Sequence, residues 1–105
     1  MATWMYLLHA PREDFVTTMT DKEQNIMGIH FLHLRKKFLE GEILLVGPCL
    51  DGKYGLCIFD AENETTASEF MNADPAIAMG LMTGELHPYK VSLLRKSEEV
   101  DVGKK

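Results

Sequence analysis

The chain has 105 residues, of which 46% are hydrophobic, and its formal net charge is −5. This length suits a single domain, expected over residues 1–94, that buries a core without a metal or disulfide, followed by a polar tail over residues 95–105. The acidic balance argues against nucleic acid or an anionic membrane as partner. The apolar run Trp4–Leu8 is too short for a signal peptide or a membrane span, so we expect a cytoplasmic protein.

The first half of the chain begins with a strand and a long helix. Thr3–Ala10 is rich in aromatic and aliphatic residues in weak alternation, which predicts a strand. Arg12–Met19 predicts a polar, flexible loop. Thr20-Asp-Lys-Glu23 matches a capping box, and the helix that it starts should run to about Glu40 and stop at Gly41.

Two strands, Glu42–Pro48 and Lys53–Asp60, are expected to form a hairpin, because Asp51-Gly52 between them is a type I′ turn signal. That turn sets a register with two pairs, which are Cys49 with Tyr54 and Val46 with Cys57. The two cysteines then point to opposite faces of the hairpin. We therefore expect both thiols to be reduced.

The second half of the chain adds two helix starts and a strand. Asn63–Asn72 predicts a shorter helix, and Asp74-Pro75 starts another, with Asp as N-cap and Pro at the first helical position. Glu85–Leu94 predicts the last strand. The order β-α-β-β-α-β is the split-βαβ pattern of an α+β, ferredoxin-like fold. It predicts a four-stranded antiparallel sheet with both helices on one face and the second strand at an edge.

Apolar side chains are expected on both faces of this sheet. In the predicted register the hairpin divides into two sets: Ile43, Leu45, Leu56 and Ile58 on one face, and Leu44, Val46, Cys57 and Phe59 on the other. In the first strand, Trp4, Tyr6 and Leu8 oppose Met5 and Leu7. The helices can cover only one face, and soluble monomers seldom expose so large an apolar patch. We predict a symmetric homodimer packed sheet against sheet, and leave open whether dimers assemble further.

His30 is the main candidate for chemistry. It lies on the flank of an apolar helical stripe formed by Met27, Phe31, Leu34 and Phe38. An imidazole titrates near neutral pH and can act as a general acid or base, whereas the alternative is a structural histidine at the helix–sheet margin. Asp74 is explained by its role as an N-cap, but its second carboxylate oxygen is free to accept a hydrogen bond from His30.

Other polar residues give weaker signals. His33 lies three residues from His30 and could join it in a metal site, but no metal-ligand motif is present and we expect no metal. We read His9 and His87 as structural or as lying at the rim of the sheet. The chain has no P-loop, no dinucleotide-binding glycine motif and no nucleophile elbow, so we also expect no cofactor.

Several segments, taken together, resemble the YciI-like (YCII-related) family. Their order and spacing match the family over nearly the whole chain to Leu94. The matching segments are His30 with the following Leu34-Arg-Lys-Lys-Phe-Leu-Glu-Gly41, then Leu45-Val-Gly47-Pro48, Asn72-Ala-Asp74-Pro75-Ala-Ile-Ala-Met-Gly80 and His87-Pro88-Tyr89. The resemblance implies a ferredoxin-like fold that forms a dimeric α+β barrel. It also implies an active site built on His30 and Asp74, and we add Gly47, Pro48 and Pro75 as expected substrate-binding residues.

Three functions stay open at this point. The first is a cofactor-independent enzyme of the isomerase or lyase type, in which His30 transfers a proton and Asp74 orients it, acting on a small cyclic metabolite. The second is a non-catalytic dimer that binds a small molecule or acts as an accessory domain. The third is a purely structural dimer, in which His30 is a satisfied core group and Asp74 only a cap.

Overall fold

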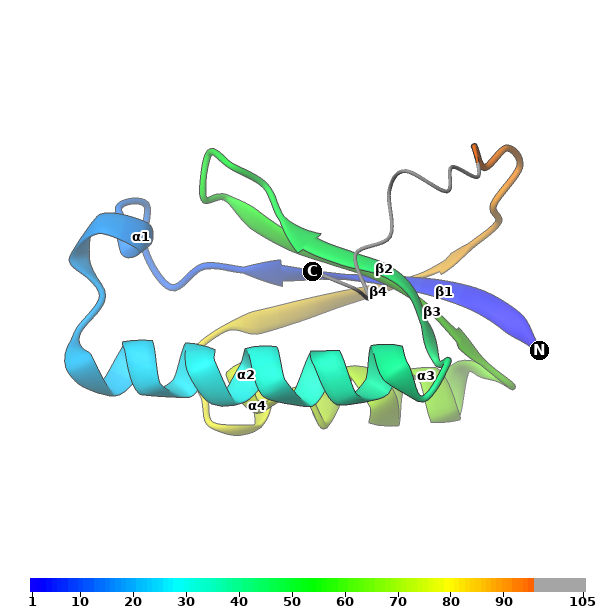
Figure 1. Ribbon diagram of the computed structural model, residues 1–105, viewed down its shortest axis with the longest axis horizontal. Helices are drawn as coiled ribbons and strands as arrows, with labels where there is room; N and C mark the ends of the chain where they lie inside the picture. Colours follow the sequence, from blue (N-terminus) through cyan, green and yellow to red (C-terminus); the bar gives the residue numbers. More distant parts are fainter. Residues whose placement is uncertain (96–105) are drawn as a thin grey trace.

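The computed structural model describes residues 1–95, which form a single sheet with helices packed against it (Figure 1). The elements in chain order are β1 (Ala2–His9), α1 (Phe15–Thr18), α2 (Asp21–Leu39), β2 (Ile43–Pro48), β3 (Tyr54–Ala61), α3 (Glu64–Asn72), α4 (Pro75–Ala78) and β4 (Thr83–Tyr89). The predicted polar tail, apart from Arg95, lies outside the described residues. No helix within residues 1–95 is long and apolar enough to cross a membrane.

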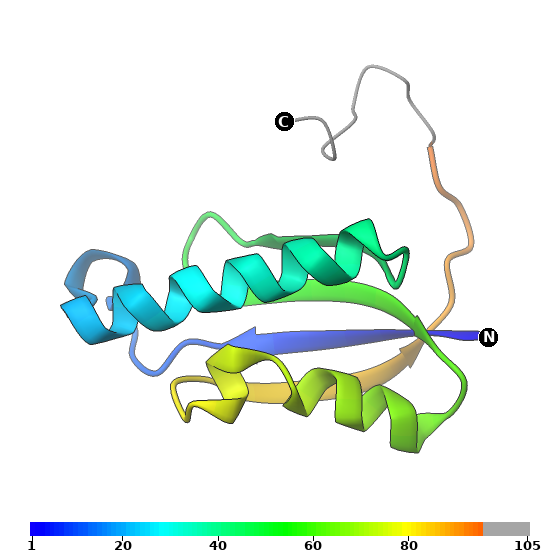
Figure 2. The ribbon, with the colours of Figure 1, turned by 60° about the horizontal axis from the view of Figure 1, so that its bottom comes forward.

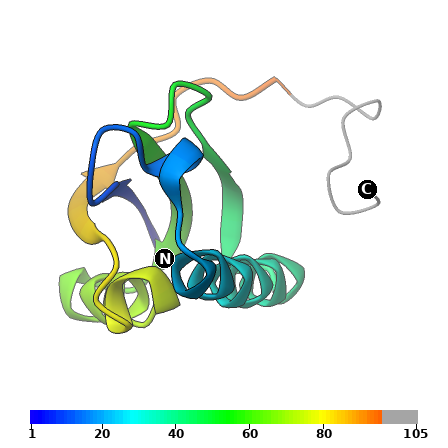
Figure 3. The ribbon, with the colours of Figure 1, turned by 90° about the vertical axis from the view of Figure 1, so that its left-hand side faces the viewer.

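The sheet has four antiparallel strands in the order β2-β3-β1-β4, so the predicted ferredoxin-like topology is confirmed and β2 lies at an edge. Helices α2, α3 and α4 cover one face of the sheet, and no described helix covers the other (Figures 2 and 3). The short helix α1 stands at the end of the sheet near the start of α2 (Figure 1).

The helix boundaries follow the capping signals in the sequence. The Thr20 hydroxyl accepts a hydrogen bond from the Glu23 backbone N–H at 3.1 Å, and the Glu23 carboxylate accepts one from the Thr20 N–H at 2.9 Å. This reciprocal pair satisfies N–H groups that the first turn of α2 would leave without partners. After α2 the chain turns through Gly41, whose φ of 86° favours glycine.

The core lies between the helices and the covered face of the sheet. Trp4, Tyr6 and Leu8 of β1 point into it, in the alternation predicted for this strand. The Tyr6 ring meets Phe59 of β3 edge to face at a centroid distance of 5.6 Å, and Phe59 stacks on Phe70 of α3 at 4.3 Å. These rings tie the central strands to α3 by close aromatic packing.

A β-bulge in β2 changes the predicted division of the hairpin faces. Ile43 pairs with Phe59, whereas Leu45 pairs with Ile58, so Leu44 is an extra residue on the bulged strand. Ile43 therefore lies in the core with Phe59, and the prediction that it shares a face with Leu45 is wrong. The alternation of a regular strand cannot reveal such an inserted residue.

The hairpin keeps its predicted pairing with a different turn. Val46 pairs with Cys57, and the Cys49 N–H donates to the Tyr54 carbonyl at 2.8 Å, as expected. A type I′ turn needs a positive φ at both central residues, but in this loop only Gly52 has one, at 78°. The Gly52 N–H instead donates to the Cys49 carbonyl at 2.9 Å, so the type I′ prediction is wrong. Both cysteines are free.

Two further boundaries differ from the prediction. The segment after β1 contains α1 where a loop was predicted. A four-residue helix with only Phe15 buried is too short to give a periodic signal in the sequence. The last strand runs from Thr83 to Tyr89 and does not continue to Leu94. Tyr89 already pairs with Thr3, so β1 has almost no backbone left to pair with later residues.

Candidate functional site

Three elements bring His30, Asp74 and Tyr6 together. His30 lies in α2, Asp74 is the N-cap of α4, and Tyr6 comes from β1. The His30 Nδ1 lies 2.6 Å from Asp74 Oδ1, and the Tyr6 hydroxyl donates to Asp74 Oδ2 at 2.7 Å. A helix, a helix start and a central strand thus meet at one carboxylate.

The Asp74 carboxylate is fully buried, with 0% exposure. A buried charge is costly without partners. Asp74 has three, because its Oδ1 also accepts the Ala76 backbone N–H at 2.9 Å as the cap of α4. The two roles considered for Asp74 from the sequence, helix cap and partner of the histidine, therefore occur together.

The protonation of the cluster follows from these contacts. Burial raises the pKa of Asp74, but the hydrogen bonds from His30 and Tyr6 outweigh it, so that the pKa lies below its ordinary value. Burial, and then the nearby Cys57 and Asp74, raise the pKa of Tyr6, so the phenol stays protonated and donates. Asp74 is thus a carboxylate at neutral pH and Nδ1 of His30 carries the proton of their hydrogen bond. The Nε2 atom of His30 has no hydrogen bond with any of residues 1–95.

A cavity of about 540 Å³ opens beside His30, between α2, α1 and the β2–β3 hairpin. His30 and Tyr6 line it, and the expected substrate-binding residues Gly47 and Pro48 form part of the opposite wall. Asp74 lies behind His30 and does not line the cavity, and Pro75, which starts α4, does not line it either. Most other lining residues are apolar, among them Leu8, Phe15, Met19, Met27, Phe31, Leu34, Phe38, Val46 and Met82.

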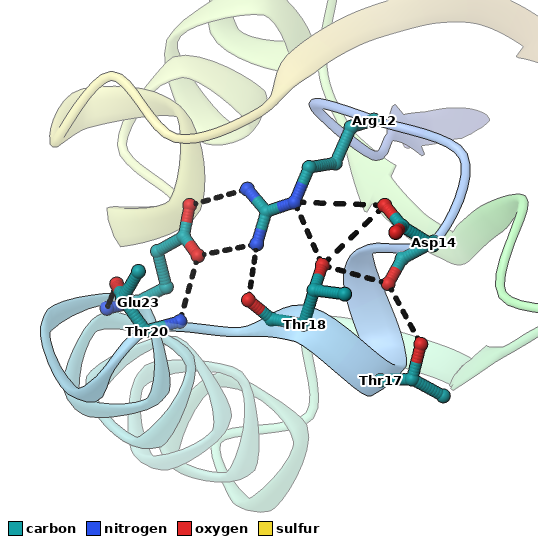
Figure 4. A network of polar contacts seen from close by, with 6 residues as sticks. All are labelled: Arg12, Asp14, Thr17, Thr18, Thr20 and Glu23. Atoms are coloured by element: carbon teal, nitrogen blue, oxygen red, sulfur yellow. Dashed lines mark hydrogen bonds and ion pairs between the residues drawn. The ribbon is translucent and has the colours of Figure 1, made fainter.

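Phe15 and Val16 of α1 line part of the cavity, and Arg12 joins α1 to the start of α2 (Figure 4). The Arg12 guanidinium donates to both carboxylate oxygens of Glu23, at 2.8 and 2.9 Å. It also donates to the Thr18 hydroxyl at 2.8 Å and to the Thr18 carbonyl at 2.7 Å. The hydrogen bonds from Arg12, followed by that from the Thr20 N–H, hold the pKa of Glu23 at about 2. The segment predicted as a solvated loop is therefore fixed by a charged network.

The other histidines lie apart from this cluster. Burial lowers the pKa of His33, which makes no hydrogen bond or ion pair with the described residues. His9 and His87 both contact the Glu85 carboxylate on the uncovered face of the sheet. Within residues 1–95, no group of three or more His, Cys, Asp or Glu side chains is arranged to hold a metal ion.

Sequence reasoning did not single out Tyr6 as a site residue. The alternation of β1 placed it on the inner face with Trp4 and Leu8, which marks it only as a core residue. A tyrosine buried among apolar neighbours needs a hydrogen-bond partner for its hydroxyl, so its predicted burial could have indicated a polar group close to it. The identity of the partner depends on the path of the chain, since 68 positions separate Tyr6 from Asp74.

The fold and the site define an α+β protein of ferredoxin-like topology with a histidine–aspartate pair beside a cavity. No family model matches the sequence, and no curated protein matches it. Among solved structures, the chain is similar to 5-chloro-2-hydroxyhydroquinone dehydrochlorinase (TftG) from Burkholderia phenoliruptrix, in its complex with 2,5-dihydroxybenzoquinone. The TM-score is 0.59 at 18% identity, over 83% of this chain and 93% of that one. This likeness extends over nearly the whole described fold and shows that the two chains share it.

Proposed function

We propose that this protein is a YciI-like enzyme that moves a proton on a small cyclic metabolite, in an isomerisation or an elimination that needs no cofactor. The observation that carries the proposal is the 2.6 Å contact between His30 Nδ1 and Asp74 Oδ1, which leaves Nε2 unbonded at the cavity wall. In the proposed mechanism, Nε2 takes a proton from the substrate. In an isomerisation it returns this proton at another carbon, whereas in an elimination the leaving group departs with its bonding electrons and the imidazolium gives the proton to solvent. In both cases Asp74 fixes the tautomer and stabilises the imidazolium.

The cavity supports this proposal by its surroundings. Its wall is mainly apolar and includes Phe15 and Val16 of α1, so a bound ring would bury apolar surface there. Acid/base catalysis by one group supplies about 10²–10⁴-fold, so positioning in the cavity must add the rest. The neighbour of the same fold is a dehydrochlorinase that binds a quinone, which makes eliminations on substituted rings the first reactions to try.

The test measures chloride release from 5-chloro-2-hydroxyhydroquinone and proton exchange on a panel of substituted cyclohexenones and lactones. We expect His30→Ala to lower turnover by about 10²-fold or more on any compound that the wild type transforms. His33→Ala is the matched control, since it removes an imidazole from the same helix without touching Asp74, and it should keep activity. Equal turnover by wild type and His30→Ala would refute the mechanism.

The second candidate is a non-catalytic domain that holds a small molecule in the same cavity. The size and the apolar wall of the cavity favour binding as much as catalysis. In this case compounds bind, His30→Ala weakens their binding, and no compound is transformed faster than in buffer. Measurement of binding and turnover on the same panel separates the two candidates.

We also propose that two copies pack through their uncovered sheet faces. That face carries the apolar side chains of Met5, Leu7, Leu45 and Leu56. A second copy would cover them and form the dimeric α+β barrel that the family resemblance implies. The cavity is lined by core residues such as Tyr6 and Leu34, and also by Leu45 and Leu56 of the uncovered face.

A further inference from the structure

The cavity wall differs in charge from the rest of the chain. Asp and Glu outnumber Lys and Arg in the sequence by 16 to 11, yet no Asp or Glu is among the residues that line the cavity. Two cationic residues do line it, Arg35 of α2 and Lys53 of the hairpin. An apolar wall with cationic groups and no carboxylate favours an anionic ligand over a cationic one.

Arg35 is available to bind such a ligand. Its guanidinium forms no hydrogen bond or ion pair with residues 1–95, whereas Arg12 and Lys37 each contact carboxylates. Arg35 also lies one helical turn after Phe31, so a ring and a cation stand side by side on the cavity side of α2. This pair matches a ligand with an apolar ring and one negative group.

The helix sets the distance between Arg35 and His30. Arg35 follows His30 by five positions, which is a rise of about 7.5 Å along the helix axis. One substituted six-membered ring can span that length, with its charged group at one end and its reacting carbon at the other. Lys53 is a weaker candidate for the anion, because it lies on the hairpin and an ammonium lacks the planar fork that matches a carboxylate.

We propose that the cavity takes a planar ring compound with a carboxylate or an ionised phenol, whose anionic group is bound by Arg35 while its ring lies beside His30. The proposal rests on the function above only for the identity of the reacting end. The anionic group would orient the ring, so that one carbon faces Nε2 of His30. Arg35 is then a residue that determines specificity by charge.

The experiment compares two probes of equal shape, benzoate and its neutral analogue benzamide, by isothermal titration at neutral pH and low salt. We expect the wild type to prefer benzoate, and Arg35→Gln to reduce the ratio of the two dissociation constants by roughly fivefold. Lys36→Gln is the matched control, because it removes the same charge from the next position of α2, outside the cavity wall. It should leave the ratio unchanged.

Three results would overturn the proposal. One is a wild type that binds the two probes equally, and another is an Arg35→Gln protein with the full preference for benzoate. The third is a preference that disappears in His30→Asn or Lys53→Gln while Arg35→Gln retains it, since the anion would then lie at another residue. Failure of the proposed function is seen separately, as turnover that does not depend on His30 in a protein that still selects benzoate through Arg35.

Discussion

Tyr6, His30 and the Ala76 N–H share one buried carboxylate, and each contact keeps Asp74 ionised in an apolar setting. The arrangement defines the histidine tautomer and anchors α4 at the same time. A single substitution at Asp74 therefore alters both the site and a helix start. Substitutions of its partners separate these effects better.

We predict that Tyr6→Phe destabilises the protein by about 1–3 kcal/mol, because Asp74 Oδ2 loses its donor in a buried position. The folded-state pKa of Asp74 is depressed, so its contribution to stability is present above the unfolded value near 3.9 and is lost as pH falls through the folded value. Tyr6→Phe reduces this depression, so the acid-dependent loss of stability should be smaller and should be complete at a higher pH.

Urea unfolding followed by circular dichroism across acidic and neutral pH measures both effects. Tyr89→Phe is the control, because that hydroxyl lies on an exposed residue at the end of β4 and forms no hydrogen bond with the described residues. An unchanged acid limb in Tyr6→Phe would contradict the assigned role.

The site residues could be predicted only in part from the sequence. His30 and Asp74 were proposed as a pair through the family resemblance, and they do lie within hydrogen-bond distance. Helical periodicity alone put His30 only near the core. Pro75 lies away from the cavity wall, because the cap geometry turns Asp74 toward His30 while Pro75 begins α4.

Among the elements, α1 is held in place by the ion pair between Arg12 and Glu23. We predict that Glu23→Gln loosens α1, because an amide cannot accept both guanidinium hydrogen bonds from Arg12 as a carboxylate does. Glutamine still completes a capping box, so α2 should stay intact. Amide hydrogen exchange should therefore speed up over Phe15–Thr18 and remain unchanged in α2.

In the wild type, acid should also speed up amide exchange over α1, because protonation of Glu23 weakens its contact with Arg12. The pKa of Glu23 is depressed to about 2, so the Arg12 contact is fully present above the ordinary glutamate value and is lost only as pH falls toward 2. Glu13→Gln is the control variant, since Glu13 is exposed and forms no hydrogen bond or ion pair with Arg12 or Glu23. Equal exchange in both variants would show that Glu23 does not hold α1.

Alanine substitutions at two glycines, one in the hairpin turn and one in α2, should change the stability in opposite directions. Gly52 has a φ of 78°, and a Cβ there would lie 3.0 Å from a Val16 methyl group, so Gly52→Ala should destabilise the protein by about 1–2 kcal/mol. Gly28 lies inside α2 with no atom within 4 Å of its would-be Cβ. Gly28→Ala should stabilise the protein by about 0.5–1 kcal/mol. Thermal unfolding of both variants measures the two changes in stability. Similar shifts in both would contradict the assigned geometry.

The elements with local signals were predicted well, and those set by tertiary contacts were not. Capping residues located the starts of α2, α3 and α4 within one residue. The helix α1 depends on Phe15 and Arg12, whose partners come from later segments. The bulge at Leu44 and the end of β4 depend on neighbouring strands, which local pattern does not describe.

For the whole molecule, the main prediction concerns the uncovered sheet face. We expect the wild type to sediment as a dimer and Leu7→Lys to sediment as a monomer, because Leu7 lies on that face in a central strand. Leu32→Lys is the control, since Leu32 is 67% exposed on α2, on the helical side. A wild type that stays monomeric at micromolar concentration, or a Leu7→Lys protein that stays dimeric, would refute the face-to-face arrangement.

The two outer strands also affect how copies can meet. In β2 the bulge between Ile43 and Leu45 interrupts the regular ladder, and Pro48 ends the strand without an N–H to donate. In β4 the proline at position 88 likewise removes a donor. Neither edge offers a long, even row of backbone groups on which a strand from another molecule could be added. Edge strands of this kind protect against the repeated addition of strands from other molecules and against fibre formation, even in a crowded solution.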